Sequence, residues 1–125
     1  MSLTIRVEEG RLQTRTIHLE GRLDNDSAAA FDKELDAVLA TSPMVLVFDL
    51  TKLEYITSSG LRSIFRGQKA MNSRSGKSVL LNPTPQVQKV LDIVKVSGLG
   101  SVFTSIRELD EYLDAMQKKV VDGDA

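Results

Sequence analysis

The sequence contains no cysteine among its 125 residues, which excludes disulfide bridges, thiol nucleophiles and thiolate metal sites. Its one histidine is His18, so a zinc site would need carboxylates for the remaining ligands, and a Ser-His-Asp triad would need this ring as its base. Tryptophan is absent and aromatic residues make up 5% of the chain, which argues against a base-stacking platform for nucleic acid. We therefore expect no metal, no cofactor and no catalytic residue.

An excess of one charge and a long apolar run are also lacking. The formal net charge is −1, so no global field attracts nucleic acid or an anionic membrane. The longest apolar run, Met44 to Phe48, is far too short to cross a bilayer. The first ten residues carry charges and do not resemble a signal peptide. The sequence predicts a cytoplasmic protein with no membrane insertion and no nucleic-acid partner.

The hydrophobic pattern predicts strands that alternate with helices in an α/β domain. Period-two alternation and short buried runs predict strands at residues 3–7, 15–19, 44–48, 79–81 and 102–103. Apolar stripes at helical spacing, with capping residues, predict helices at residues 27–40, 57–74, 85–97 and 105–116. The order is β-β-α-β-α-β-α-β-α. It implies a mixed sheet of four to five strands with four helices, in which a hairpin precedes parallel strands joined by right-handed crossovers.

The boundaries of these units follow from turn and breaker residues. We expect one domain over residues 1–117 and a polar tail over residues 118–125. The second strand is expected to end at Gly21, and a loop is expected from the end of the third strand through Tyr55.

The stretch from Asp49 to Leu61 joins a buried strand to a helix that begins with two serines and a glycine. In a structural interpretation, Ser58 or Ser59 caps the helix, and Gly60 allows another segment to approach closely. Asp49 then ends the strand and accepts bonds from loop amides. In a functional interpretation, a phosphoserine at the helix N-terminus is stabilised locally and adds about −1.5 to −2 charges to the surface.

Other polar residues also have structural interpretations. A lone histidine on a strand is expected to be structural or exposed, and this applies to His18. Asp24 belongs to a cluster of helix N-cap residues before the first helix. Arg62 and Arg66 are expected on a solvated helix face that borders the serines, where they could pair with an acidic partner.

Two separated motifs resemble the STAS family, the domain shared by sulphate transporters and anti-sigma-factor antagonists. The first motif is Asp49-Leu50 followed by Leu53, Ile56 and the run Ser58-Ser59-Gly60-Leu61, and the second is Gly21-Arg22-Leu23-Asp24. The predicted order of strands and helices is similar to that of STAS domains over nearly the whole chain.

The resemblance implies a partner-switching mechanism. An unphosphorylated antagonist binds an anti-sigma factor, which is also a serine kinase of the histidine-kinase-like ATPase type, and the sigma factor is released. The kinase then phosphorylates the antagonist and dissociates, and a PP2C-type phosphatase resets the cycle. The phosphoacceptor of the family matches Ser58, with Ser59 as second candidate and Thr57 as third. We expect the partner to bind at Asp24, Asn25, Thr57, Ser58, Ser59, Gly60 and Arg62.

Thr57 departs from the pattern of many phosphorylated members, which have Asp immediately before the acceptor serine. A hydroxyl cannot supply the same fixed negative charge to the kinase interface. A STAS module that docks without phosphorylation, in a transport, chemotaxis or stress-signalling assembly, therefore remains an alternative. An enzyme or nucleotide-binding domain ranks third, because the sequence has no phosphate-binding loop, metal cluster or convincing general base.

Overall fold

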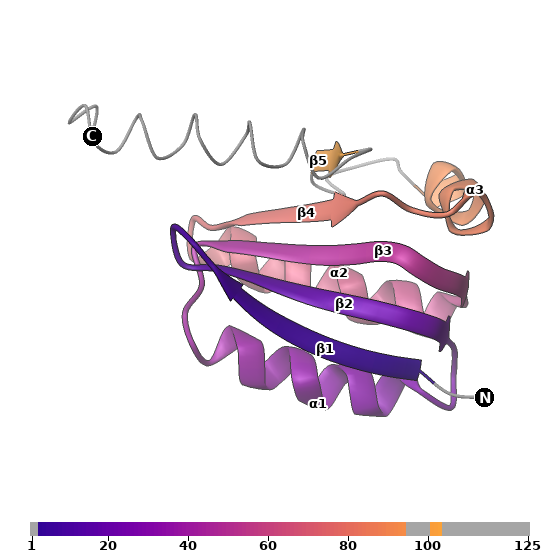
Figure 1. Cartoon of the computed structure of the whole chain (residues 1–125), viewed down its shortest axis with the longest axis horizontal. Coiled ribbons are helices and arrows are strands. Elements are labelled where there is room, and N and C mark those ends of the chain that lie inside the picture. Colours follow the sequence, from indigo (N-terminus) through magenta and orange to yellow (C-terminus); the bar gives the residue numbers. More distant parts are fainter. Residues whose placement is uncertain (1–2, 95–100, 104–125) are drawn as a thin grey trace.

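A five-stranded mixed sheet lies at the centre of the molecule, with its strands in the order β1-β2-β3-β4-β5 (Figure 1). The computed structural model describes residues 3–94 and 101–103. Its elements are β1 (Leu3–Gly10), β2 (Thr14–Leu23), α1 (Ala28–Leu39), β3 (Val45–Ile56), α2 (Ser58–Ser73), β4 (Lys77–Leu81), α3 (Pro85–Val94) and β5 (Ser101–Phe103). The predicted order is confirmed through the fifth strand. The predicted fourth helix and the tail lie outside the described residues.

The sheet combines one antiparallel hairpin with three parallel pairs. β1 and β2 are antiparallel, whereas β2, β3, β4 and β5 pair in parallel along the sheet. Parallel neighbours need a crossover connection, and the intervening helices supply it. The central strand is buried on both faces at Val45 to Phe48, as its continuous apolar run predicts.

Helices α1 and α2 cover one face of the sheet, with α1 against β1 and β2 and α2 against β3 and β4 (Figure 1). The main core lies in this layer, where Phe31 of α1 meets Phe48 of β3 edge to face at 6.1 Å between ring centroids. Burying such a side chain contributes about 1.5–3 kcal/mol. A smaller apolar cluster on the other face consists of Val45, Val47, Val79 and Leu81, with Leu12 against it.

Two predicted boundaries are wrong, and both errors shorten strands that lead to the candidate site. β2 continues past Gly21 to Leu23, and β3 continues through the predicted loop to Ile56. Pairing persists because two register shifts near Gly21 absorb the mismatch between the strands. Gly21 also has a φ of 110°, which glycine adopts easily. The paired residues Leu23 and Ile56 therefore end both strands at the same edge of the sheet.

No helix in residues 3–94 is long and apolar enough to cross a membrane.

Candidate functional site

The candidate site lies where β2 and β3 end and where α1 and α2 begin. Ligands and partners of parallel α/β sheets gather at the carboxyl ends of the strands, because several loops and helix N-termini meet there. The backbone N–H of Thr57 donates to the carbonyl of Leu23 at 3.0 Å. This bond holds the start of α2 beside the segment that begins at Asp24, so two stretches more than thirty residues apart in sequence form one surface.

Gly60 makes this close approach possible. A Cβ atom on Gly60 would lie 2.7 Å from Cγ of Leu23 and 2.9 Å from its carbonyl oxygen, both nearer than real Cβ contacts. The prediction that Gly60 admits a neighbouring segment is therefore confirmed. Gly60 is itself buried, so it shapes the surface from beneath.

Thr57, and not either serine, caps α2. Its backbone is extended, at φ −106° and ψ 176°, and its hydroxyl accepts from the N–H of Gly60 at 3.5 Å. The prediction that Ser58 or Ser59 caps the helix is wrong, because both residues already lie inside the helix, which begins at Ser58. Ser58 is exposed and Ser59 is half-buried. The Ser58 hydroxyl has no hydrogen-bond partner among the described residues, and it faces solvent one position after the cap.

Asp24 is fixed by a local network at the start of α1. Its carboxylate accepts the N–H groups of Asp26 at 3.0 Å and Ser27 at 3.1 Å. Partial desolvation disfavours the charged form, but the bonds from Ser27 and neighbouring groups together hold the pKa of Asp24 below its ordinary value. Ser27 occupies the N-cap position, yet its hydroxyl donates to the carbonyl of Arg22 at 2.8 Å and makes no capping bond. Asp24 thus stays ionised beside the start of α2.

A shallow groove of about 330 Å³ runs between the beginnings of α1 and α2. It is lined by Asn25, Ala28, Ala29, Asp32, Ser59, Arg62, Ser63 and Arg66. The structure therefore brings together three residues that were predicted to contact a partner: Asn25, Ser59 and Arg62. Most of the other lining side chains are small, so the groove is open to a protruding group of a partner.

The two arginines of the groove differ in their surroundings. Arg66 donates to Asp36 at 2.7 Å and to Asp32 at 3.1 Å, both on α1. The bond to Asp36, aided by the one to Asp32, raises the pKa of Arg66 above its ordinary value. Arg66 is exposed, as expected for a solvated face, but its guanidinium is held by carboxylates of α1. Arg62 is exposed and has no ion-pair partner among the described residues.

The fold and this site agree with a known family. The model of the STAS domain matches residues 6–109. The chain belongs to the STAS domain family. BtrV of Bordetella bronchiseptica, which is named as an anti-sigma factor antagonist, is 33% identical over 85 residues, covering 68% of this chain and 71% of BtrV.

Two solved structures share the STAS fold of this chain. SpoIIAA, an anti-sigma factor antagonist, matches in its unphosphorylated form with a TM-score of 0.77 and 19% identity, over 90% of this chain and 97% of that one. SpoIIAA of Bacillus in its phosphorylated form matches with a TM-score of 0.71 and 19% identity, over 88% and 99%. At this identity the likeness concerns the fold.

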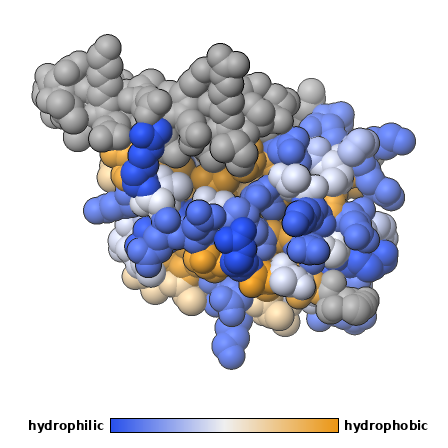
Figure 2. Space-filling view, viewed as in Figure 1, coloured by the Kyte–Doolittle hydropathy of each residue, from blue (hydrophilic) through white to orange (hydrophobic). Residues whose placement is uncertain are grey.

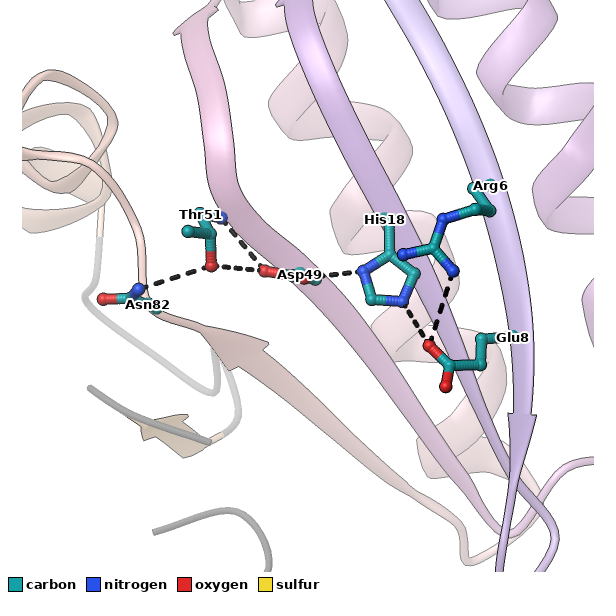
Figure 3. Close-up of polar contacts among 6 residues, drawn as sticks. All are labelled: Arg6, Glu8, His18, Asp49, Thr51 and Asn82. Carbon is teal, nitrogen blue, oxygen red and sulfur yellow. Dashed lines mark hydrogen bonds and ion pairs between the residues drawn. The ribbon is translucent and has the colours of Figure 1, made fainter. Parts of the chain in front are cut away.

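The other face of the STAS sheet carries a second polar cluster, which sequence reasoning did not assemble (Figure 3). His18 lies between two carboxylates, with Nδ1 2.6 Å from Asp49 and Nε2 2.7 Å from Glu8. Arg6 approaches Glu8 at 3.6 Å. The cluster crosses β1, β2 and β3, because His18 pairs with Arg6 on one side and with Asp49 on the other. Only the register between strands could have revealed it.

Asp49 is the anchor of this cluster. One of its oxygens accepts the hydroxyl of Thr51 at 2.6 Å and the N–H of Thr51 at 3.0 Å. Asn82 extends the chain of bonds by donating to the Thr51 hydroxyl at 3.3 Å. Desolvation opposes the charge, but the Thr51 bonds and His18 hold the pKa of Asp49 below its ordinary value. These contacts give Asp49 a structural role, but the expectation that it ends the strand and accepts from loop amides is wrong, because β3 continues to Ile56 and Thr51 lies within it.

A depression of about 510 Å³ accompanies the cluster, lined by Thr4, Arg6, His18, Leu19, Glu20, Asp49, Thr51 and Lys52. Figure 2 shows hydrophilic side chains across the middle of this face of the molecule. Among the described residues, no group of His, Asp and Glu side chains could hold a metal ion.

Proposed function

We propose that this chain is an anti-sigma-factor antagonist that binds an anti-sigma factor when Ser58 is unphosphorylated and releases it when Ser58 carries phosphate. The observation that carries the proposal is the free Ser58 hydroxyl, exposed at the first residue of α2 and not used as its cap. The name of BtrV and the fold shared with SpoIIAA, solved in both phosphorylation states, support the same role.

The geometry suits a switch that acts at the surface. A helix N-terminus presents unpaired N–H groups and partial positive charge, so a phosphate on Ser58 is tolerated there and the helix stays folded. The same phosphate places about two negative charges and a hydrated group where a partner would dock. A loss of about 3 kcal/mol at that contact weakens binding more than a hundredfold.

The partner is an anti-sigma factor with serine kinase activity. In the transfer, the Ser58 oxygen forms a bond to the γ-phosphorus of ATP as the bond to ADP breaks, and the hydroxyl proton passes to a base of the kinase. A PP2C-type phosphatase hydrolyses the phosphoserine and restores the binding form. All chemistry is supplied by these partners, so the chain itself is not an enzyme. Because ATP-dependent phosphorylation drives the cycle, we infer that it operates in the cytoplasm.

The test compares three variants for binding to the cognate anti-sigma-factor kinase, with and without ATP. Ser58→Asp is expected to lose binding by at least tenfold, because a fixed charge occupies the docking surface. Ser58→Ala is expected to bind in both conditions, since it cannot be phosphorylated. Ser73→Asp, at the other end of α2 and also exposed, is the matched control and should bind like the wild type.

Thr57 favours one competing function, a STAS subunit that docks without phosphorylation, because no carboxylate stands immediately before Ser58. A complex that tolerates Ser58→Asp, together with an absence of phosphate on Ser58 in protein from the native host, would favour that function. Phosphate found by mass spectrometry on Ser59 would instead move the switch by one residue.

A further inference from the structure

Arg62 is an uncommitted cation close to the proposed phosphorylation site. Its side chain is exposed and lines the groove between α1 and α2. Arg66, one turn further along α2, is bound by Asp32 and Asp36. A negative group added near the start of α2 would therefore find Arg62 available, whereas Arg66 would first have to leave its partners.

The spacing on α2 brings Ser58 and Arg62 together. Residues four apart on a helix are neighbours on its surface, with Cβ atoms about 5–6 Å apart. Long side chains in a helix lean toward its N-terminus and lie over the preceding turn, so the Arg62 guanidinium can extend over Ser58. An acidic group four residues before a basic one is also the more favourable order.

Several polar groups around this point already hold bonds within the fold. The carboxylate of Asp24 is occupied by bonds from Asp26 and Ser27, with Arg22 at 3.7 Å. The preceding residue, Thr57, is neutral and uses its hydroxyl as the helix cap. Within the groove, the Asp32 carboxylate forms an ion pair with Arg66. Attraction to Arg62 thus meets little local competition.

We propose that Arg62 binds the phosphate of phosphorylated Ser58 within the same helix, an inference that rests on Ser58 being the acceptor. The contact draws the phosphate toward the mouth of the groove and neutralises the one groove cation that has no partner among the described residues. Phosphorylation then changes the docking surface twice, by adding a hydrated anion and by removing a free guanidinium that an acidic partner could bind.

The experiment uses the full chain with phosphoserine installed at position 58 during translation, and follows its phosphate by ³¹P NMR between pH 4 and 8. A nearby cation favours the dianion, so Arg62→Gln is expected to raise the titration midpoint, which is near 6 for phosphoserine, by roughly 0.3 pH unit. Arg62→Lys should restore part of the shift because it keeps the charge. Arg66→Gln is the matched control, and its midpoint should stay close to that of the unsubstituted phosphoprotein.

Equal midpoints in Arg62→Gln and the unsubstituted phosphoprotein would overturn the proposal, as would an equal shift in Arg66→Gln. Because the phosphate is installed without a kinase, this result is independent of whether a kinase modifies Ser58. If NMR showed the contact between Arg62 and the phosphate but no kinase phosphorylated Ser58, the proposed function would fail and this inference would stand.

Discussion

One polar region lies within β3 and another lies just after it, at the start of α2. The polar side chains are bonded to one another in the first region and, within the described residues, are left without partners in the second. Asp49, in the middle of β3, is bonded to His18 and Thr51, and through them to Glu8 and Asn82 (Figure 3). Beyond the end of β3, at the first residue of α2, the Ser58 hydroxyl has no partner among the described residues. Arg62, one turn further along α2, also has no partner among the described residues. We call the bonded side chains around Asp49 the closed region, and Ser58 with Arg62 the open region.

The comparison distinguishes side chains that stabilise the fold from side chains that are available to bind a partner. A polar group whose bonds are satisfied inside the chain has little left to offer a partner, and its removal costs stability. A polar group left open costs little to keep at the surface and can bond to an incoming molecule. Substitutions at His18 or Asp49 should therefore change folding, whereas substitutions at Ser58 or Arg62 should change binding or its regulation.

The largest effect is expected from a substitution at Gly60, which packs beneath the open region. In Gly60→Val, the new side chain meets Leu23, whose carbonyl oxygen would lie 2.9 Å from the Cβ atom. Overpacking of this kind costs up to about 3 kcal/mol, more than the helix propensity gained by replacing glycine. Urea unfolding should show this loss, and binding to the anti-sigma-factor kinase should fall with it.

Gly10→Val is the control for this variant. A Cβ atom on Gly10 would lie 3.7 Å from Thr14, an ordinary contact, and valine suits an exposed strand. Its stability should stay within about 0.5 kcal/mol of the wild type. Equal losses in the two variants would show that the Leu23 contact is not what requires glycine at position 60.

A smaller effect is expected from breaking the closed region with Asp49→Asn. The substitution keeps the shape of the side chain but removes the charge that Thr51 and His18 stabilise, so we expect a loss of about 1–1.5 kcal/mol near pH 7. Because the folded-state pKa of Asp49 lies below the ordinary 3.8, this contribution is present above pH 3.8 and disappears as the pH falls through the folded value. Partner binding should not change.

Urea unfolding of the wild type and Asp49→Asn at pH 5 and pH 3 checks this expectation, since carboxylates outside this cluster contribute equally to both proteins. The difference in stability should be smaller at pH 3 than at pH 5. Glu8→Gln, whose side chain is 56% exposed, serves as the control with a loss of about 0.5 kcal/mol. A gap that stays constant down to pH 3 would contradict the role given to the Asp49 charge.

The sequence allowed the succession of elements to be predicted, because alternation and helical spacing are local. It also indicated Ser58, since a strand followed by two serines and a glycine is a local pattern with a family resemblance. The extensions of β2 and β3 escaped prediction, because pairing with a neighbouring strand overrode the turn preference of Gly21. The cap at Thr57 was missed because it depends on where the backbone of β3 ends.

Side-chain contacts between different strands and helices were the feature that the sequence predicted least well. The bonds of His18 to Glu8 and Asp49 depend on the register of three strands, and no periodicity within one strand fixes that register. The bonds of Arg66 to Asp32 and Asp36 depend on how α1 lies against α2. From the sequence, Arg62 and Arg66 were therefore expected to be equivalent surface arginines. In the fold, Arg66 is bonded to α1 and Arg62 has no partner among the described residues.

The smallest expected effect sharpens the comparison at this pair of arginines. Arg66→Gln removes the bonds to Asp32 and Asp36, and exposed ion pairs of this kind are worth about 0.5 kcal/mol. Arg62→Gln should leave the stability of the unphosphorylated chain unchanged, because no bond among the described residues is lost. Urea unfolding at low salt and in about 1 M NaCl separates the two, since salt screens the Arg66 pairs and should close the gap. Equal destabilisation by both variants would mean that Arg62 is also committed within the fold, and the distinction between a closed and an open region would then fail on α2.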